Sequence, residues 1–202
     1  SPAHRSDCEF VLGLIAWNEG RTETATLHLQ RSVSAAQTVG DLFRTCWSQL
    51  RLMVAIAGQG DSQTVLPLLA QIRWNVLRLG DPLALAALHV FVGGMEARRG
   101  LLQSARRHTE LGQALLEVEG NPWLEAIAEN NLVGVSLATC DFSDGMIHAE
   151  RALLLAEESG DAALRRACLG NIGNLYCESG EFDRTIEHFE RADALLPSSG
   201  EF

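Results

Sequence analysis

Glycine recurs at one constant spacing along this chain, and that spacing constrains the fold more than any other feature. The series holds Gly40, Gly80, Gly120, Gly160 and Gly200. The residues that follow them are Asp41, Asp81, Asn121, Asp161 and Glu201. Glycine just past a helix allows the left-handed conformation that ends it, and Asp or Asn beside it caps the next helix. The series therefore predicts five units, at residues 1–40, 41–80, 81–120, 121–160 and 161–200.

A second glycine series lies halfway between the members of the first. It holds Gly20, Gly60, Gly100 and Gly180, and Cys140 takes the remaining place. These residues predict a turn inside each unit, so that every unit is a hairpin of two helices. Pro82 and Pro122 suit the first position of a helix, where the missing N–H costs nothing.

The last unit shows how such a hairpin packs. Leu169, Ile172, Gly173 and Tyr176 follow the i, i+3, i+4, i+7 spacing of one apolar helix face, and Gly173 leaves room for a second helix. The facing stripe is predicted to consist of Ile186, Phe189, Ala192 and Leu196, with Pro197 ending the helix. One hairpin cannot bury its own apolar face, so it must stack on its neighbours.

This spacing resembles the tetratricopeptide repeat, whose pattern is W-x2-L-G-x2-Y, then A-x3-F, then Pro. Leu169 replaces the usual Trp and Thr185 the usual Ala. A length of 40 alone would favour HEAT or armadillo repeats, since the tetratricopeptide repeat has about 34 residues. The motif and the absence of proline inside any first helix favour the tetratricopeptide repeat. The resemblance implies an all-α, right-handed α-solenoid of five repeats, a single domain over residues 1–200. The 40-residue variety is similar to arrays in large bacterial regulators, namely signal-transduction ATPases, LuxR-like activators and multidomain kinases.

Composition agrees with stacked helices of small residues, since 47% of the chain is hydrophobic and only 6% aromatic. No run of 18 apolar residues and no signal peptide is present, so we expect a soluble cytoplasmic protein that is not bound to a membrane. The cysteines are Cys8, Cys46, Cys140, Cys168 and Cys177. Their odd number and the lack of C-x-x-C predict buried, reduced thiols rather than a metal site or disulfides.

The net charge of −10 lies wholly in residues 121–202, because Arg and acidic residues balance in residues 1–120. Nucleic acid is therefore not an expected partner, since phosphate binding needs a basic surface. A basic peptide or domain would be drawn to the C-terminal half. The alternative is an ordinary solvated helix face, carrying Glu181, Asp183, Glu187 and Glu190.

The ends of the chain suggest a piece of a longer protein. The sequence begins at Ser1 and stops where a sixth unit would start. Glu201-Phe202 is also what an EcoRI cloning site encodes, which makes these two residues candidates for vector sequence. No polar capping helix follows Pro197, so the apolar face around Ile186 and Leu195 is expected to stay open and to promote self-association.

The resemblance implies that the first helices line a concave surface where peptides bind. The candidate residues there are Trp17, Trp47, Arg51, Val54, Arg98, Asn130, Asn131, Asn171, Asn174 and Glu178, and the same helix phase includes Phe10, Leu50, Val90 and Gly94. An asparagine side chain both donates and accepts, so the four asparagines suit an extended backbone, although asparagine also occurs at these phases without a ligand. Trp17 and Phe10 alternatively pack against an upstream repeat. Arg51 and Arg98 are candidates for an acidic group, or are plain surface charges. The carboxylate clamp of heat-shock co-chaperones is absent, because Phe10, Val90 and Gly94 occupy its basic positions.

No enzyme motif is found: the chain has no lysine for a phosphate loop, no H-E-x-x-H and no G-x-S-x-G. His28, His108, His148 and His188 share one phase. Equivalent atoms in stacked repeats would lie roughly 8–10 Å apart, too far to share a metal. These histidines are interpreted as partly buried packing residues, with a pH-sensitive series of histidines as the alternative.

The expected function is a non-catalytic protein-interaction module of a larger bacterial regulator, with no cofactor and no metal. The alternative is the ligand- or peptide-sensing domain of a transcriptional regulator or signalling enzyme.

Overall fold

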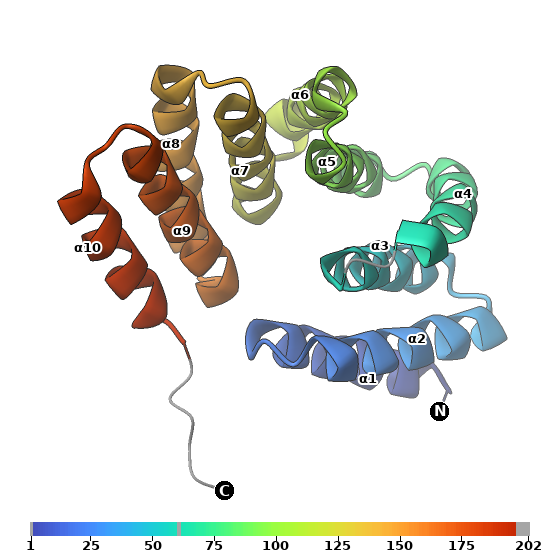
Figure 1. Ribbon diagram of the computed structural model, residues 1–202. Helices are drawn as coiled ribbons and strands as arrows, with labels where there is room; N and C mark the ends of the chain where they lie inside the picture. Colours follow the sequence, from blue (N-terminus) through green and yellow to red (C-terminus); the bar gives the residue numbers. More distant parts are fainter. Residues whose placement is uncertain (1, 60–61, 197–202) are drawn as a thin grey trace, which may run out of the picture. The chain divides into compact units, whose positions relative to one another are not determined.

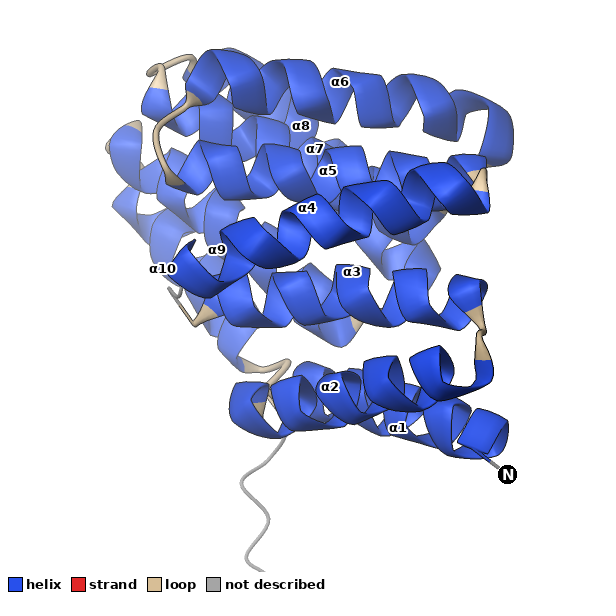
Figure 2. Cartoon of the chain, turned by 90° about the vertical axis from the view of Figure 1, so that its right-hand side faces the viewer, coloured by secondary structure: helices blue, strands red, loops and turns tan. Residues whose placement is uncertain are grey.

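A computed structural model describes residues 2–59 and 62–196, and this part of the chain is helical throughout apart from short turns (Figures 1 and 2). The first helices of the hairpins are α1 (Pro2–Asn18), α3 (Leu42–Gly58), α5 (Pro82–Arg98), α7 (Pro122–Ala138) and α9 (Ala162–Glu178). The second helices are α2 (Thr22–Val39), α4 (Ser62–Leu79), α6 (Leu102–Glu119), α8 (Phe142–Ser159) and α10 (Phe182–Asp193). The starting positions of the first helices keep the constant spacing of the glycine series. The predicted all-α fold of five hairpins is confirmed.

Both glycine series lie at the turns. Positive φ angles between 63° and 77° are found at Gly20, Gly40, Gly80, Gly100, Gly120, Gly160 and Gly180. Cys140, which takes the glycine place in the fourth hairpin, also has a positive φ, of 58°. Gly60 and Gly200 lie outside the described residues. The constant spacing thus reflects a repeated need for left-handed backbone, which glycine meets at the lowest cost.

The acidic and amide residues after the first series cap the next helices as predicted. The side chains of Asp41, Asn121 and Asp161 each accept a hydrogen bond from the backbone N–H three residues later, at 2.8–3.0 Å. Asp161 also accepts a hydrogen bond of 2.8 Å from Trp123 Nε1 at the start of α7. Because Asp161 caps α9, this residue fixes its helix against the neighbouring first helix.

We expect the substitution Cys140→Gly to stabilise the protein by about 0.5 kcal/mol, because glycine removes the left-handed strain of a residue with a Cβ. The greater freedom of the unfolded glycine chain offsets part of the gain. Urea unfolding followed by circular dichroism measures the difference. The converse change, Gly100→Ala, places a Cβ at a φ of 74° and should destabilise by about 1 kcal/mol. A destabilised Cys140→Gly would contradict this account.

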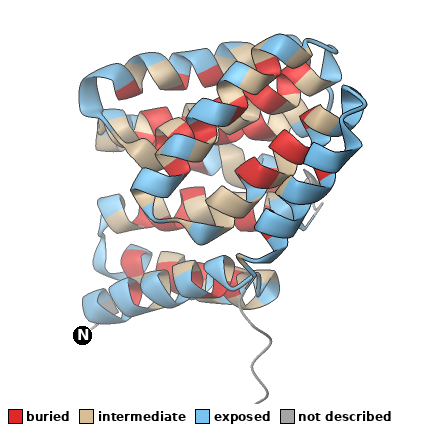
Figure 3. Cartoon of the chain, turned by 90° about the vertical axis from the view of Figure 1, so that its left-hand side faces the viewer, coloured by how far each residue is buried: buried red, intermediate tan, exposed pale blue. Residues whose placement is uncertain are grey.

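Two compact units make up the chain, residues 1–91 and residues 92–202, and the division falls within α5. In unit 1 the core is built from residues such as Leu29, Leu50, Met53 and Ile72. In unit 2 Val133 and Ala149 pack with Ile172 and Leu175. Buried residues occupy the faces on which the helices meet, while the opposite faces are exposed (Figure 3). Within the described residues, none of the helices combines the length and apolar character needed to cross a bilayer.

The last hairpin packs on a narrower stripe than predicted. A Cβ on Gly173 would lie 2.7 Å from Phe189 Cε1, which confirms that this glycine admits the second helix. Thr185 and Ala192 are buried, whereas Ile186 and Leu196 are exposed. Ile186 and Leu196 therefore do not face α9, and that part of the predicted stripe is wrong. Pro197 lies outside the described residues.

The cysteines differ in their surroundings. Cys46 and Cys168 are buried, but Cys8, Cys140 and Cys177 are exposed, so the prediction of buried thiols is wrong for these three. Burial, followed by the nearby charge of Asp81, raises the pKa of Cys46 to about 11. Burial, followed by the charge of Asp161, raises the pKa of Cys168 to about 12.

Alkylation should separate these two classes of cysteine. Only the thiolate form of cysteine reacts with the reagent. Burial raises the pKa of Cys46 and Cys168, so both thiols stay protonated, and it also keeps the reagent away from them. At mildly alkaline pH we expect iodoacetamide to label Cys8, Cys140 and Cys177 quickly in the folded protein. Mass spectrometry of peptides gives the rates, and unfolding in urea should equalise all five sites. Rapid labelling of Cys168 in the folded protein would contradict the packing described.

Candidate functional site

The first helices of unit 2 lie side by side, and their asparagines hold them in register. Asn171 Nδ2 on α9 donates a hydrogen bond of 2.9 Å to Asn130 Oδ1 on α7. On the other side of α7, Asn131 lies against Gly94 of α5, where a Cβ would be only 2.6 Å from Asn131 Oδ1. We call the surface formed by Asn130, Asn131, Gly134, Gly170, Asn171 and Asn174 the first-helix face of unit 2.

The hydrogen-bonding capacity of this face is not exhausted. The bond between Asn130 and Asn171 uses one acceptor and one donor, which leaves Asn130 Nδ2 and Asn171 Oδ1 for another molecule. Asn174, one turn further along α9, is exposed and has no hydrogen-bond partner among the described residues. A donor on α7, an acceptor on α9 and the complete amide group of Asn174 on α9 therefore retain hydrogen-bonding capacity.

Glycines leave open space beside these amides. A Cβ placed on Gly134 or Gly170 would meet no atom within 4 Å. Both glycines lie in helix interiors, where glycine costs about 0.5–1 kcal/mol relative to alanine. Glu178, at the end of α9, and Arg98, at the end of α5, are exposed. The backbone of a bound peptide could therefore approach the first-helix face closely beside these glycines. Charged side chains lie at the helix ends.

The remaining candidates lie in unit 1, where packing explains much of their environment. Trp17 on α1 lies against Gly58 on α3, since a Cβ there would be 3.4 Å from Trp17 Cη2. The guanidinium of Arg44 lies 4.6 Å from the centre of the Phe10 ring and forms an ion pair of 2.7 Å with Asp7. Trp17 and Phe10 therefore both pack against α3, the first helix of the next hairpin.

The other candidate residues of unit 1 fall into two groups, one half-buried and one fully buried. Trp47, Arg51 and Val54 on α3 are half-buried. Leu50 and Val90 are fully buried and do not line a surface, so their assignment to the concave phase is wrong. Helices α3 and α5 each pack against several neighbouring helices. More of their surface is therefore buried than the apolar stripe of a single hairpin predicts.

Sequence reasoning missed a buried carboxylate in unit 2. Glu129 on α7 is only 2% exposed, and its Oε2 lies 2.6 Å from His148 Nδ1 on α8. Its Oε1 accepts from Gln113 Nε2 on α6 at 3.1 Å and lies 3.2 Å from Arg151 Nε on α8. One side chain thus joins three consecutive helices.

A second carboxylate extends this network. Asp144 on α8 accepts a hydrogen bond of 3.0 Å from Ser136 Oγ and lies 3.5 Å from Arg106 on α6. The hydrogen bond from Ser136, with the charges of His148 and Arg106, holds the pKa of the Asp144 carboxyl below its usual value. The network stabilises the packing of α6, α7 and α8.

The sequence contains a pattern that could have revealed this network: a glutamate and a histidine that recur at the same separation in two hairpins. Glu9 and His28 in the first hairpin form the same pair, at 2.7 Å, three repeats before Glu129 and His148. The histidine series is evident in the sequence, but the acids that precede it at a fixed distance were missed. His188 lacks such an acid; its Nδ1 donates to the Arg184 carbonyl at 2.9 Å, and its ring lies beside Tyr176. Two of the series histidines therefore form hydrogen bonds with carboxylates that join the two helices of a hairpin.

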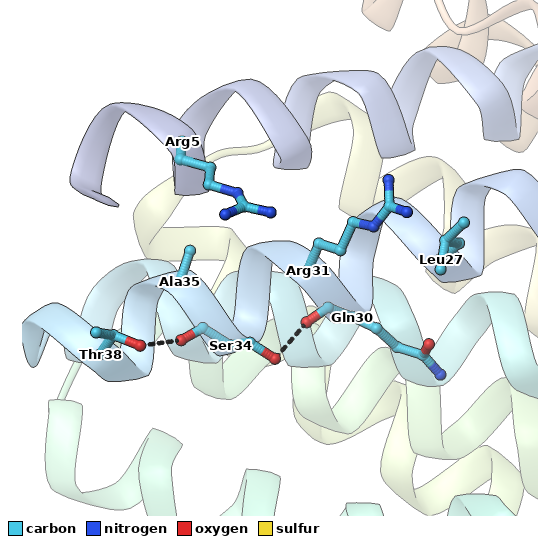
Figure 4. A pocket seen from close by; sticks show the side chains of 7 residues that line it. All are labelled: Arg5, Leu27, Gln30, Arg31, Ser34, Ala35 and Thr38. Atoms are coloured by element: carbon cyan, nitrogen blue, oxygen red, sulfur yellow. Dashed lines mark hydrogen bonds between the residues drawn. The ribbon is translucent and has the colours of Figure 1, made fainter. Parts of the chain in front are cut away.

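A hollow lies between α1 and α2 in unit 1 (Figure 4). It is lined by Arg5, Leu27, Gln30, Arg31, Ser34, Ala35 and Thr38. The guanidinium groups of Arg5 and Arg31 point into the space between the two helices, and neither has an ion-pair partner among the described residues. This hollow is open, and its lining contains no aromatic side chain. Two positive charges without a counter-charge would suit an anionic group at the surface.

Comparison with known proteins identifies the fold. No protein-family model and no curated protein sequence matches the chain. Among solved structures, BtubC (BKLC) from P. vanneervenii has a TM-score of 0.60 at 16% identity, covering 95% of this chain and 82% of its own. TPR-like repeats of a kinesin light chain-like protein from Podosopora anserina have a TM-score of 0.58 at 16% identity, covering 100% and 99%. A single-substitution variant of those repeats has 0.57 at 17% identity, covering 95% of each chain. The fold is thus that of tetratricopeptide-like repeats.

Proposed function

We propose that this chain is a non-catalytic protein-interaction module of a larger bacterial regulatory protein in the cytoplasm. Its first-helix face in unit 2 binds an extended segment of a partner protein. The observation that carries the proposal is the pair of Asn130 and Asn171, bonded to each other and each with hydrogen-bonding capacity left. The likeness to tetratricopeptide-like repeats supports an interaction module in general terms.

An extended peptide suits this surface for chemical reasons. Its backbone offers alternating N–H and C=O groups, which need an acceptor and a donor respectively when water is displaced. Asn171 Oδ1 supplies the acceptor and Asn130 Nδ2 the donor, while the neighbouring glycines let the peptide main chain come close. Recognition through the backbone tolerates many sequences, so the charges around the face would decide which partner binds.

Charge favours a basic partner at this end of the chain. Residues 121–202 carry the whole net charge of −10. Glu178 is exposed beside Asn174, and Asp183, Glu187 and Glu190 are exposed on α10. A partner segment with Lys or Arg would be attracted over a distance of about 8–10 Å at physiological salt. Binding should therefore weaken as salt is raised.

The proposal is tested by affinity capture from a lysate of the organism that encodes the chain. The immobilised chain is compared with the double substitution of Asn130→Ala and Asn174→Ala, and bound proteins are read by mass spectrometry. Gln103→Ala removes an exposed amide from α6 and serves as the matched control. We expect a partner that is captured by the parent and the control and is lost from the double variant.

Recovery of the same proteins by all three forms would refute binding at the first-helix face. Circular dichroism of the double variant must match the parent for the comparison to hold. Asn174 has no hydrogen-bond partner among the described residues, and Asn130→Ala removes one half-buried hydrogen bond, worth about 1 kcal/mol, so the double variant should keep its fold.

A further inference from the structure

Helix α4, the second helix of the second hairpin, carries apolar side chains outside the core of unit 1. Leu66, Ala70, Trp74 and Leu77 follow the i, i+4, i+8, i+11 spacing of one helix side, and we call these four residues the α4 stripe. Trp74 is 65% exposed, Leu77 66% and Leu66 52%, and Ala70 is exposed as well. The buried residues lie on another side of α4, and they are Val65, Ile72, Asn75 and Val76.

The other second helices are polar where the α4 stripe is apolar. The positions that match Ala70 hold Gln30, Glu110, Glu150 and Glu190. The positions that match Leu77 on α2, α6 and α8 hold Gln37, Glu117 and Glu157. Hairpins precede and follow the one that contains α4, so the exposure of the stripe does not arise from the ends of the sequence. Large apolar side chains gathered at a surface mark an interaction site, and Trp is enriched among the residues that contribute most to binding.

Arginine side chains border the α4 stripe. With about 3.6 residues per turn, Arg73 and Arg78 lie at opposite edges of the stripe. Both are exposed, and neither forms an ion pair within the part of the chain that the structure describes. Helix α4 itself contains no Asp or Glu. An acidic partner would therefore meet two positive charges without a counter-charge, whereas a basic partner would be repelled.

The chemistry of the stripe favours a helix as the partner segment. Apart from the indole N–H of Trp74, the four side chains offer no hydrogen-bonding group. An extended segment lying on them would lose water from its backbone N–H and C=O groups without replacing those bonds. A helix bonds its own backbone internally, and its apolar side chains can match the length of about 16 Å from Leu66 to Leu77.

We propose that the α4 stripe docks an acidic amphipathic helix of a partner protein. The apolar side of that helix packs on Leu66, Trp74 and Leu77, and its carboxylates pair with Arg73 and Arg78. The stripe lies on a second helix of unit 1, separate from the first-helix face of unit 2, and it selects a partner of the opposite charge. This inference goes beyond the proposed function and does not rest on it.

Fluorescence anisotropy with two labelled peptides tests the proposal. Each peptide has about 18 residues, enough to cover the stripe, and is held helical by a hydrocarbon staple. Both carry Leu along one side, and the remaining positions are Glu in one peptide and Lys in the other. The parent chain should bind the Glu peptide at least about tenfold more tightly than the Lys peptide. Trp74→Ala should weaken binding of the Glu peptide by more than about tenfold.

Two further variants sharpen the test. Leu154→Ala is the matched control, since Leu154 occupies the position of Trp74 two repeats later, on α8, and is also 65% exposed. It should bind the Glu peptide like the parent. The double substitution of Arg73→Glu and Arg78→Glu should reverse the preference, so that the Lys peptide binds more tightly. Circular dichroism checks that each variant keeps its fold.

Several results would overturn the proposal. They are no binding of the Glu peptide by the parent, equal binding of the two peptides, or an equal loss in Leu154→Ala and Trp74→Ala. Binding of the parent to vesicles of phosphatidylglycerol and phosphatidylcholine, abolished by Trp74→Ala, would instead make the stripe a membrane surface. Dimers of the parent in sedimentation velocity that Trp74→Ala abolishes would mean that a second copy covers it.

The two proposals can fail separately. The double variant of Asn130→Ala and Asn174→Ala alters only the first-helix face of unit 2, so it should bind the Glu peptide like the parent. A loss of peptide binding in that variant would place the peptide on the first-helix face and overturn docking on α4.

Discussion

Replacing Gly93 with alanine should lower the free energy of unfolding of unit 2 by about 3 kcal/mol, at the upper end of the usual cost of overpacking. Gly93 lies on α5 where α6 crosses it. A Cβ there would lie 3.0 Å from the Ala105 carbonyl oxygen and 3.1 Å from the Thr109 backbone nitrogen, and would also collide with Thr109 Oγ1. The hydroxyl can rotate away, but the backbone atoms of α6 can move only if the helix moves.

Urea unfolding of Gly93→Ala, followed by circular dichroism, measures this cost. Gly134→Ala is the matched control because it makes the same change in the interior of α7, where a Cβ meets no atom within 4 Å. Alanine is the better helix former, so the control should be stabilised by about 0.5–1 kcal/mol. Opposite signs for the two substitutions are expected. Similar effects would show that α5 and α6 do not approach as closely as described.

Replacing Glu129 with alanine should cost about 2 to 3 kcal/mol, somewhat below the roughly 3–5 kcal/mol that is usual for breaking a buried ion pair. The substitution removes an acceptor shared by Gln113, His148 and Arg151, and it opens a small space between α6, α7 and α8. The loss is reduced because the Arg151 side chain is 65% exposed and can turn to water.

Glu9→Ala provides the comparison for Glu129→Ala. Glu9 occupies the same phase three repeats earlier, pairs with His28 and is less deeply buried, so its removal should cost about 1 kcal/mol. Both values come from equilibrium unfolding in urea at neutral pH. A larger loss at Glu9 than at Glu129 would contradict the role given to the buried network.

The repeat structure could be predicted from the sequence because backbone conformation is a local property. Left-handed turns select glycine, and helix starts select Asp or Asn, so the constant spacing located the hairpins. Even Cys140 occupies a glycine position in the sequence pattern, and its φ of 58° confirms it. Tertiary packing was predicted less well, since the phase of a helix does not fix the angle at which its neighbour crosses. Ile186, placed inside the last hairpin by its spacing, is exposed for this reason.

The candidate site illustrates the same limit. The asparagines of α7 and α9 were expected on one surface, and Asn130 and Asn171 do meet there. Leu50 and Val90 have the same helix phase but are buried, because a helix packed on several sides exposes a narrower arc. Glu129 was missed because a single glutamate in a helix sequence normally indicates a position that is exposed to solvent. Only its fixed separation from a histidine on the next helix, repeated at Glu9, distinguishes it.

Site-specific photo-crosslinking tests the central claim, that the first-helix face of unit 2 binds a partner segment. A benzophenone amino acid at position 134 would project from α7 into open space beside the asparagines. The same group at Ile147, an exposed position on α8, is the control. The account predicts that irradiation in lysate gives a specific crosslinked protein from position 134 that is absent from position 147. A specific product from position 147 alone, or the same products from both, would contradict it.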